Sequence, residues 1–446
     1  MRSKDPILEN VRASHESRPA LCVHHALKAL PSGASLVVAL SGGLDSTLLL
    51  TLAAALCREK TPLRALHVNH GMQPAAPVFE AHCRALCAAL GVPLTVATAE
   101  VVVEKGGQGP EAAARVARYR ALAAHTAAEE VLWLAQHADD QAETFLLAAL
   151  RGSGVRGLAA MPAERRWQQR LFQRPLLALT RAELEEEARR LGLEWCEDPT
   201  NVDRHLDRNY LRHEVMAPLH RRWPQAAVML SRSAGWLGEA DALLEELAAE
   251  DLVRAGGDPG RLPLSALGAL GASRRRLLIR HALSRLALPH PPAARLLELS
   301  RQLTAVACDS RGLIAWPGGE ARLWRGALYL KMPQAPVARH WQAEWDGQAP
   351  LATPRGVLDY RLDREKSEAG SGEAAALIVT PRRGGERLRL EGRGTRAVKR
   401  LLQEAAVPPW ERDGLFVVWY REQPVALLGA LTLAAAGWRL TGPPGE

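Results

Sequence analysis

Several features that would assign this chain to a common protein class are missing from its sequence. The 446 residues include only six cysteines and no Cys-x-x-Cys pair, so neither a disulfide framework nor a paired-cysteine metal site is expected. No apolar run is long enough to cross a membrane, and residues 1–20 lack the apolar core of a signal peptide. No repeat of solenoid period is present. We therefore expect a soluble, cytoplasmic protein that does not contact membranes.

The bulk composition is that of a globular protein with a basic excess. Hydrophobic residues make up 47% of the chain and charged residues 24%, and the length is sufficient for two to four domains. The formal net charge of +8 favours an acidic partner, of which nucleic acid is the first candidate.

The most informative segment is Ser-Gly-Gly-Leu-Asp-Ser at residues 41–46. It lies between an apolar run at 35–40, which predicts a buried strand, and a second one at 47–56, which predicts a helix. A glycine turn at that place directs unpaired backbone N–H groups and the positive end of the helix at one spot, which favours phosphate. The Gly-Lys-Ser/Thr ending of a Walker A loop is absent. The expected polyphosphate-binding residues, which the family resemblance given below assigns to ATP, are Ser41, Gly42, Gly43, Leu44, Asp45, Ser46 and, from the next strand end, His70.

Asp45 is the unusual member of this loop. A carboxylate about 4 Å from a phosphate charge is repelled by roughly 4 kcal/mol at an effective dielectric constant near 20. The positive end of a helix stabilises a nearby carboxylate by only about 0.3–1 kcal/mol. A bridging Mg²⁺ would offset the difference, so we expect Asp45 to be a magnesium ligand.

The residues from 20 to about 200 predict an α/β fold with a doubly wound parallel sheet. Apolar strand patterns at 63–69, 93–97 and 131–135 alternate with helix patterns at 78–90, 110–128 and 139–151. Ligands of such sheets bind beyond the carboxyl ends of the strands. The loop at 41–46, His70 and the segment 137–140 all fall at that edge, so we expect them in one cleft.

The remaining sequence predicts two further domains. Residues 221–331 have a mainly helical pattern, and residues 332–446 predict a linker followed by a small α+β domain with one helix near 395–404. The resulting limits are 1–220 for a catalytic domain, 221–331 for a helical domain and 332–446 for a basic C-terminal domain. Residues 381–400 hold eight basic residues against two glutamates, a net charge of +6 that is typical of a nucleic-acid-binding surface or of a solvated face.

Two groups of polar residues are candidates for catalysis. His137, Asp139, Asp140 and Glu143 place three carboxylates and an imidazole within about a turn of one helix start. Capping explains one acid there, but not three. Glu111 and Arg115 share one face of another helix, where a surface ion pair is the simpler reading. Arg208 and Arg212 lie either on a charged helix or on an element that contacts an RNA backbone.

Taken together, these motifs resemble those of the tRNA(Ile)-lysidine synthases, a bacterial branch of the N-type ATP pyrophosphatase (PP-loop) family. The resemblance rests on 41–46, 67–71, 111–119, 137–144 with 151–154, 198–201 with 208–209 and 212, and on 385–387, 399–402 and 408–413 in the tail. It is loosest between about 225 and 380. The resemblance implies that ATP adenylates C2 of the wobble cytidine in an isoleucine tRNA with anticodon CAU. Free L-lysine then displaces AMP through its side-chain amine.

The resemblance also implies roles for individual residues. Asp45 would hold Mg²⁺, Arg115 would stabilise charge during adenylyl transfer, and Asp139 is the first candidate for the base that accepts the proton of lysine. The expected lysine and cytidine site comprises His137, Asp140, Glu143 and Glu111, and the expected tRNA contacts are Arg208, Arg212, Arg387, Arg396, Lys399 and Arg400.

Other functions and the assembly state stay open at this point. A tRNA thiolase shares the phosphate loop, although such enzymes usually use cysteines to carry sulfur or a cluster, and the absence of a Cys-x-x-Cys pair argues against that alternative. An amide-forming synthetase and an RNA-binding protein with an inactive nucleotide site are further alternatives. The sequence does not fix the oligomeric state, and a homodimer is one option.

Overall fold

The computed structural model describes residues 11, 16–57, 61–69, 76–99, 110–305, 312–365 and 376–442. The chain forms two compact units, Met1–Glu246 and Leu247–Glu446, which are considered separately. The three domains with limits at 220 and 331 stay a prediction. In the described part of the chain, no helix combines the length and apolarity that a membrane span requires.

The first unit is built on a six-stranded sheet, as the sequence predicts. Its strand order is β3-β2-β1-β4-β6-β5, with all neighbours parallel except the β5–β6 hairpin, which the sequence analysis did not anticipate. From β1 to β3 each new strand is added on one side of β1, and from β4 onward strands are added on its other side. The strand order therefore switches between β1 and β4, and folds of this kind bind ligands at such a switch point. The strands are β1 (Ser35–Ala39), β2 (Leu63–Asn69), β3 (Leu94–Thr98), β4 (Glu130–Trp133), β5 (Glu164–Trp167) and β6 (Arg170–Gln173).

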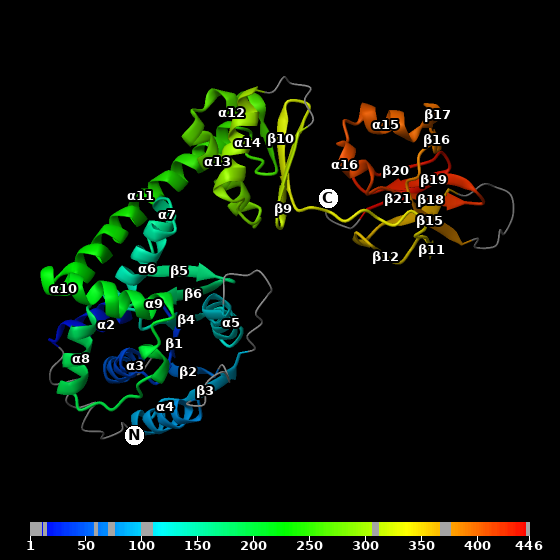
Figure 1. The fold of residues 1–446 in the computed structure, drawn as a ribbon. Helices are drawn as coiled ribbons and strands as arrows, with labels where there is room; N and C mark the ends of the chain where they lie inside the picture. Colours follow the sequence, from blue (N-terminus) through cyan, green and yellow to red (C-terminus); the bar gives the residue numbers. More distant parts are fainter. Residues whose placement is uncertain are drawn as a thin grey trace. The chain divides into compact units, whose positions relative to one another are not determined.

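Helices cover both faces of this sheet, with α2, α3 and α8 on one side and α5 on the other (Figure 1). Residues of β1 point alternately to the two faces, so Leu36 and Val38 join one core cluster and Val37 the other. The helical segments that begin in this unit are α2 (Arg18–Lys28), α3 (Leu44–Leu56), α4 (Ala76–Leu90), α5 (Pro110–Ala124), α6 (Ala138–Leu150), α7 (Val155–Leu158), α8 (Arg181–Arg190), η1 (Pro199–Val202), α9 (Asp207–Tyr210), η2 (Leu211–Met216), α10 (Ala217–Arg222) and α11 (Ala226–Arg254).

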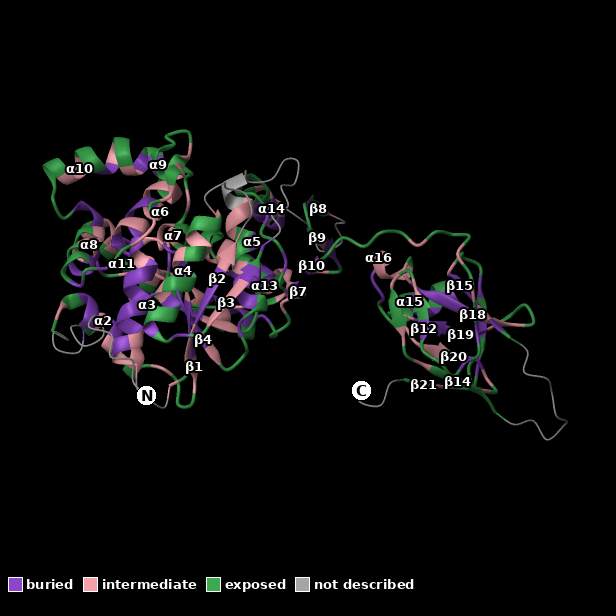
Figure 2. Ribbon diagram, turned by 90° about the horizontal axis from the view of Figure 1, so that it is seen from below, coloured by how far each residue is buried: buried purple, intermediate pink, exposed green. Residues whose placement is uncertain are grey.

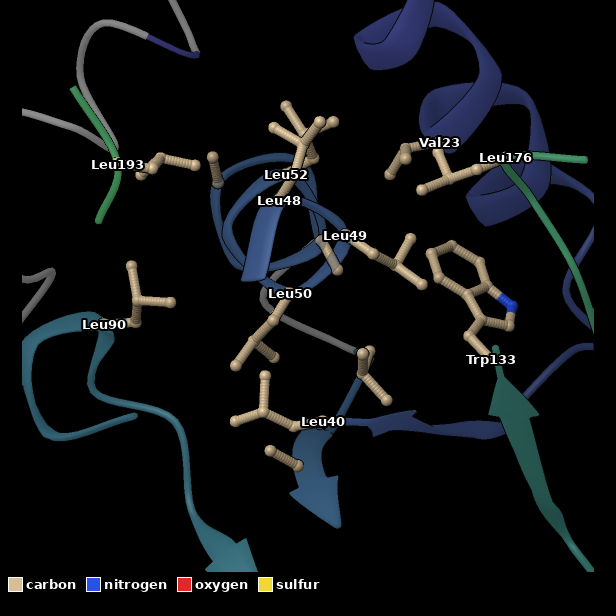
Figure 3. Close-up of a cluster of buried hydrophobic side chains, with 14 of the residues drawn as sticks. Val23, Leu40, Leu48, Leu49, Leu50, Leu52, Leu90, Trp133, Leu176 and Leu193 are labelled. Atoms are coloured by element: carbon tan, nitrogen blue, oxygen red, sulfur yellow. The ribbon is translucent and has the colours of Figure 1, made fainter. Parts of the chain in front are cut away.

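Helix α3 is central to the larger core because it is apolar on nearly every side. Leu48, Leu49, Leu50 and Leu52 are all fully buried and point in different directions from the helix axis (Figure 3). They pack among side chains from strands and helices that include Trp133, which is also fully buried. A helix buried all round is held rigidly, so its first turn is a fixed platform for the preceding loop.

The second unit contains two separate cores, and Figure 2 shows buried residues in strands β15, β18 and β19 of one of them. One core lies between helices α12–α14 and the antiparallel sheet β7-β10-β9-β8, so residues 221–331 hold more strand than the sequence predicted. The other core lies on both faces of the sheet β11-β15-β18-β19-β20. The elements are β7 (Arg261–Pro263), α12 (Leu264–Ala269), α13 (Ala272–Arg285), α14 (Ala293–Ala305), β8 (Leu313–Trp316), β9 (Gly319–Trp324), β10 (Ala327–Lys331), β11 (Ala343–Trp345), β12 (Leu351–Thr353), β13 (Gly356–Leu358), β14 (Arg361–Arg364), β15 (Leu377–Pro381), β16 (Arg387–Leu390), β17 (Gly394–Ala397), α15 (Val398–Glu404), α16 (Pro409–Arg412), β18 (Phe416–Tyr420), β19 (Gln423–Leu428), β20 (Leu433–Ala434) and β21 (Trp438–Thr441).

Candidate functional site

The loop between β1 and α3 is ordered by hydrogen bonds among its own residues. Ser46 is the hub: its Oγ lies 3.1 Å from Ser41 N and 2.9 Å from Ser41 Oγ, and it donates to Gly43 O at 3.1 Å. Gly43 is the N-cap residue of α3 and supplies no side-chain cap. The first N–H groups of α3 are therefore available to an anion at the carboxyl edge of the sheet.

Gly42 holds the loop in a conformation that other residues resist. Its φ angle is +87°, in the left-handed region, and a Cβ built on it would lie 3.2 Å from both Cys83 Sγ and Phe79 Cδ1. Its carbonyl accepts a hydrogen bond of 2.9 Å from the backbone N–H of Cys196. The loop is thus fixed from α4 on one side and from the segment after α8 on the other.

Asp45 lies in the first turn of α3 and has one carboxylate oxygen without a protein partner. Among the described residues, Asp45 Oδ1 is buried and has no hydrogen-bond partner. Asp45 Oδ2 lies 3.7 Å from His137 Nε2 and 3.6 Å from Arg181 Nη1. Burial raises the pKa of Asp45, although His137 and Arg181 oppose that rise. A buried carboxylate oxygen that lacks a donor fits a Mg²⁺ ligand, because oxygen atoms are what Mg²⁺ prefers.

His137 brings the start of α6 next to this carboxylate. Its side chain is 1% exposed, and its ring nitrogens lie 3.5 Å from Asp139 Oδ2 and 3.6 Å from Asp140 Oδ2. Burial disfavours the charged ring, but Asp140, Asp139 and Asp45 outweigh burial and raise the pKa of His137 to about 9. The ring is therefore a cation at neutral pH, which joins three carboxylates from two helices. The structure thus brings the 41–46 loop and the 137–140 segment together, as expected from the sequence.

Asp139 is held by the start of another helix. Its Oδ2 accepts a hydrogen bond of 2.8 Å from the backbone N–H of Arg181, the first residue of α8. Burial alone would raise the pKa of Asp139, but the hydrogen bonds from His137 and from the Arg181 backbone outweigh it, so the pKa is lowered.

Glu143 and Asp140 face Arg212 on the neighbouring π-helical segment η2. Arg212 donates to both oxygens of Glu143, at 2.8 Å and 3.2 Å, and its Nη2 lies 3.6 Å from Asp140 Oδ1. Arg208, one turn earlier, donates to Thr144 Oγ1 at 3.0 Å. Both arginines therefore point at α6.

Arg115 lies beside α6 rather than within the acidic cluster. Its Nη2 is 3.9 Å from Met161 Sδ, and its guanidinium carbon is 5.8 Å from the centre of the Tyr119 ring. Met161 is in turn bonded through its backbone to the buried side chain of Gln141 on α6. Of the other expected site residues, His70 lies outside the described residues, and so does the side chain of Glu111.

The basic residues of the second unit are spread over a hairpin and the helix after it. On β16, Arg387 is exposed and alternates with the buried Leu388. Across the hairpin, Arg396 on β17 pairs with Leu388 and is half-buried. Lys399 and Arg400 are exposed on α15, and Arg400 Nε donates to Glu404 at 3.0 Å.

Arg181 is the site residue that the sequence analysis missed. A signal was available, because Thr180 and Glu183 form a capping box that marks the start of a helix. In a parallel sheet that start belongs to the same edge as the phosphate loop. The distance of 3.6 Å between Arg181 Nη1 and Asp45 Oδ2 depends on the packing of α8 beside α3, and the capping pattern does not reveal that packing.

Family models match three separate parts of the chain. A family model described as the PP-loop domain matches residues 19–219. Models described as the TilS substrate binding domain and the TilS substrate C-terminal domain match residues 262–329 and 377–439. Among solved structures, the U34-tRNA thiolase NcsA from Methanococcus maripaludis with its [4Fe-4S] cluster has a TM-score of 0.43 and 18% identity, over 53% of this chain and 81% of that chain.

Curated relatives extend over nearly the whole chain. A tRNA(Ile)-lysidine synthase from Alkalilimnicola ehrlichii is 42% identical, in a match that covers 96% of this chain and 99% of that protein. Those from Xanthomonas axonopodis pv. citri and Pseudomonas aeruginosa are 43% and 42% identical, over 92% and 91% of this chain and 92% and 93% of their own lengths. The chain belongs to the tRNA(Ile)-lysidine synthase family.

Proposed function

We propose that this protein uses ATP to join free L-lysine to C2 of the wobble cytidine in an isoleucine tRNA with anticodon CAU, giving lysidine. The observation that carries the proposal is the orphaned Asp45 oxygen at an uncapped helix start, near three further carboxylates on α6. Family membership supports the substrate assignment. The modified base pairs with A instead of G, so the tRNA would read AUA as isoleucine. Translation takes place in the cytoplasm, which is where we expect the enzyme.

In the first step, the cytidine O2 attacks the α-phosphorus of ATP, the bond to the β-phosphate oxygen breaks, and diphosphate leaves. Backbone N–H groups of Gly43 and of the first turn of α3 would bind the phosphates, with the Ser41 and Ser46 hydroxyls beside them. Asp45 would hold Mg²⁺, which neutralises phosphate charge when it is bound. Arg115, whose guanidinium lies beside Met161, would stabilise the charge that develops during transfer.

In the second step, the ε-amine of lysine attacks C2 and AMP leaves. Forming the neutral amine at pH 7 costs about 4.6 kcal/mol, because the reference pKa of lysine is about 10.4. A carboxylate must bind the ammonium and accept its proton. Asp139, the first choice from sequence, is a weak proton acceptor because its pKa is lowered and its Oδ2 is bonded to α8. Burial raises the pKa of Glu143, so Glu143 is better suited to take the proton, with Asp140 beside it.

The test is incorporation of labelled lysine into RNA. Full-length protein is incubated with ATP, Mg²⁺, labelled lysine and the CAU-anticodon tRNA, and a tRNA with anticodon GAU is the matched control. We expect label in the first RNA alone, with one AMP and one diphosphate per lysine. Asp45→Asn should abolish both the labelling of the RNA and the release of AMP and diphosphate. Lysine-independent sulfur transfer, or ATP–diphosphate exchange without RNA, would refute the proposal.

Three conservative variants then assign the base. Asp139→Asn, Asp140→Asn and Glu143→Gln are each assayed for tRNA adenylation without lysine and for lysine attachment. The base is the residue whose loss abolishes attachment and preserves adenylation. If Asp139→Asn alone has that profile, the original choice holds and the preference for Glu143 is wrong.

A further inference from the structure

Arg174 is a buried arginine that has no carboxylate partner in the described part of the chain. It follows β6 directly, at the carboxyl edge of the sheet, and it is only 4% exposed. Its guanidinium donates three hydrogen bonds to neutral oxygens: from Nε to Gln136 Oε1 at 2.6 Å, from Nη1 to Pro162 O at 2.7 Å and from Nη2 to the Tyr119 hydroxyl at 3.2 Å. Burial of a cation without a counter-ion costs stability, and such costs are typical of functional sites.

Two of these three bonds fix the groups that contact Arg115. The guanidinium carbon of Arg115 is 5.8 Å from the centre of the Tyr119 ring, and its Nη2 is 3.9 Å from Met161 Sδ. Arg174 binds the hydroxyl of that ring, and it binds the carbonyl of Pro162, the residue after Met161. One buried side chain therefore holds both contacts of the Arg115 guanidinium.

The surroundings hold the same two groups from other directions. The Tyr119 ring stacks on the fully buried Phe172 of β6, with ring centres 5.5 Å apart, and it meets Trp167 of β5 edge-on at 6.0 Å. The backbone of Met161 exchanges hydrogen bonds of 2.8 Å and 2.9 Å with the buried side chain of Gln141 on α6. Close packing on these sides restricts the ring and the thioether to a narrow range of positions.

The contacts of Arg115 orient its guanidinium without neutralising it. Neither a ring face nor a thioether sulfur is an anion, and Arg115 forms no ion pair with another residue of the described ranges. A carboxylate in the same place would compete with phosphate for the guanidinium. The charge of Arg115 therefore stays available to an anionic group of a substrate.

Resting on the proposed function, in which Arg115 stabilises charge during adenylyl transfer, we propose that Arg174 is a positioning residue for Arg115. Through the Tyr119 ring and the Met161–Pro162 segment, it fixes the guanidinium that acts on the transferred phosphate. In this assignment Arg174 contacts no substrate and contributes through its three directed bonds. If its buried charge acted directly, a lysine at position 174 would serve as well.

The test is a double-mutant cycle on tRNA adenylation, measured in single turnovers with saturating full-length protein, ATP and the CAU-anticodon tRNA, in the absence of lysine. The cycle comprises wild type, Arg174→Met, Arg115→Met and the double variant, and Arg174→Lys preserves the charge. Arg170→Met is the matched control, because Arg170 also donates to a backbone carbonyl but lies at the opposite end of β6. A rate constant under these conditions does not depend on the folded fraction, so a loss of stability alone leaves it unchanged.

For Arg174→Met we expect the adenylation rate constant to fall by about tenfold or more, because small displacements of a catalytic group are costly. Its dissociation constants for ATP and tRNA should stay within about twofold of wild type. Arg174→Lys should be similarly slow, since an ammonium cannot make three bonds in fixed directions. In the Arg115→Met background, loss of Arg174 should slow adenylation by no more than about twofold, because no guanidinium is left to position. Arg170→Met should match wild type.

Equal losses from Arg174→Met in both backgrounds would show that the two arginines act independently and would overturn the proposal. An Arg115→Met protein as fast as wild type, or full activity in Arg174→Lys, would also overturn it. If Arg174→Met does not fold, Tyr119→Phe takes its place in the cycle, since it removes only the hydroxyl that Arg174 binds. It should slow adenylation by about threefold when Arg115 is present and not when Arg115 is absent, and equal losses would again overturn the proposal. A wild-type protein that transfers no AMP to the tRNA refutes the proposed function itself, which differs from a failed cycle in an active protein.

Discussion

The charge on His137 predicts a specific dependence of stability on pH. Its ring is 1% exposed and lies within 3.7 Å of the carboxylates of Asp45, Asp139 and Asp140. The backbone N–H of Asp139 also lies 3.3 Å from Nδ1, but that contact is long and three carboxylates outweigh it. Burial opposes the charged ring, yet the acids raise its pKa to about 9 from the ordinary value of 6.5.

The size of the effect follows from this difference. About 2.5 pKa units at 1.36 kcal/mol each give a contribution of up to about 3 kcal/mol to the free energy of unfolding. Because the folded pKa lies above the unfolded one, the contribution is fully present below pH 6.5. It is lost as the pH rises through 9.

The assay is urea unfolding of metal-free, full-length protein in EDTA at pH 6.5, 8 and 9.5, compared with His137→Asn. Asparagine can still cap α6 but carries no charge, so the difference between the two proteins isolates the ring. We expect that difference to shrink by about 3 kcal/mol across the range, and the ring to titrate near 9 by NMR. A constant difference, or a ring that titrates near 6.5, would refute the reasoning.

Three further predictions concern the loop, the core and the tail. Gly42→Ala should lower ATP affinity by about tenfold in an equilibrium binding assay, because a left-handed residue with a Cβ costs about 1–2 kcal/mol and the new methyl would press on Cys83. Trp133→Ala should lower the free energy of unfolding by about 3–5 kcal/mol in urea, since it removes a fully buried ring and leaves Gln173 without its indole donor. Neutralising four basic side chains of the second unit should weaken tRNA binding. It should also reduce the slope of the logarithm of the binding constant against the logarithm of the salt concentration by up to about 3. An unchanged slope would exclude these four side chains from the RNA interface. Those four are Arg387, Arg396, Lys399 and Arg400.

Most of the first unit could be predicted because its signals are local. The strand at 63–69 and the turn at 41–46 follow from apolar runs and glycine, and the structure has β2 at Leu63–Asn69 and α3 starting at Leu44. The strands β8–β10 could not be predicted in the same way. They are short and lie in a stretch whose alanine, leucine and arginine content favours helix, so non-local contacts stabilise them: pairing with one another and packing against α12–α14.

The contacts of the site likewise include some that the sequence predicts and one that it does not. That Asp45 and the α6 acids would meet follows from the order of parallel strands. The direction of Arg212 does not, since arginines four residues apart in a helical segment have the same pattern whether they face solvent or a buried glutamate. Glu143 lies 69 residues away, and no local pattern connects the two.

The tether between Cys196 and the phosphate loop uses main-chain atoms alone, with the N–H of one residue meeting the carbonyl of Gly42. This hydrogen bond therefore does not depend on which side chain occupies position 196. In a saturation library, most replacements there should remain active. Proline is the exception, because it alone removes the hydrogen on which the tether depends.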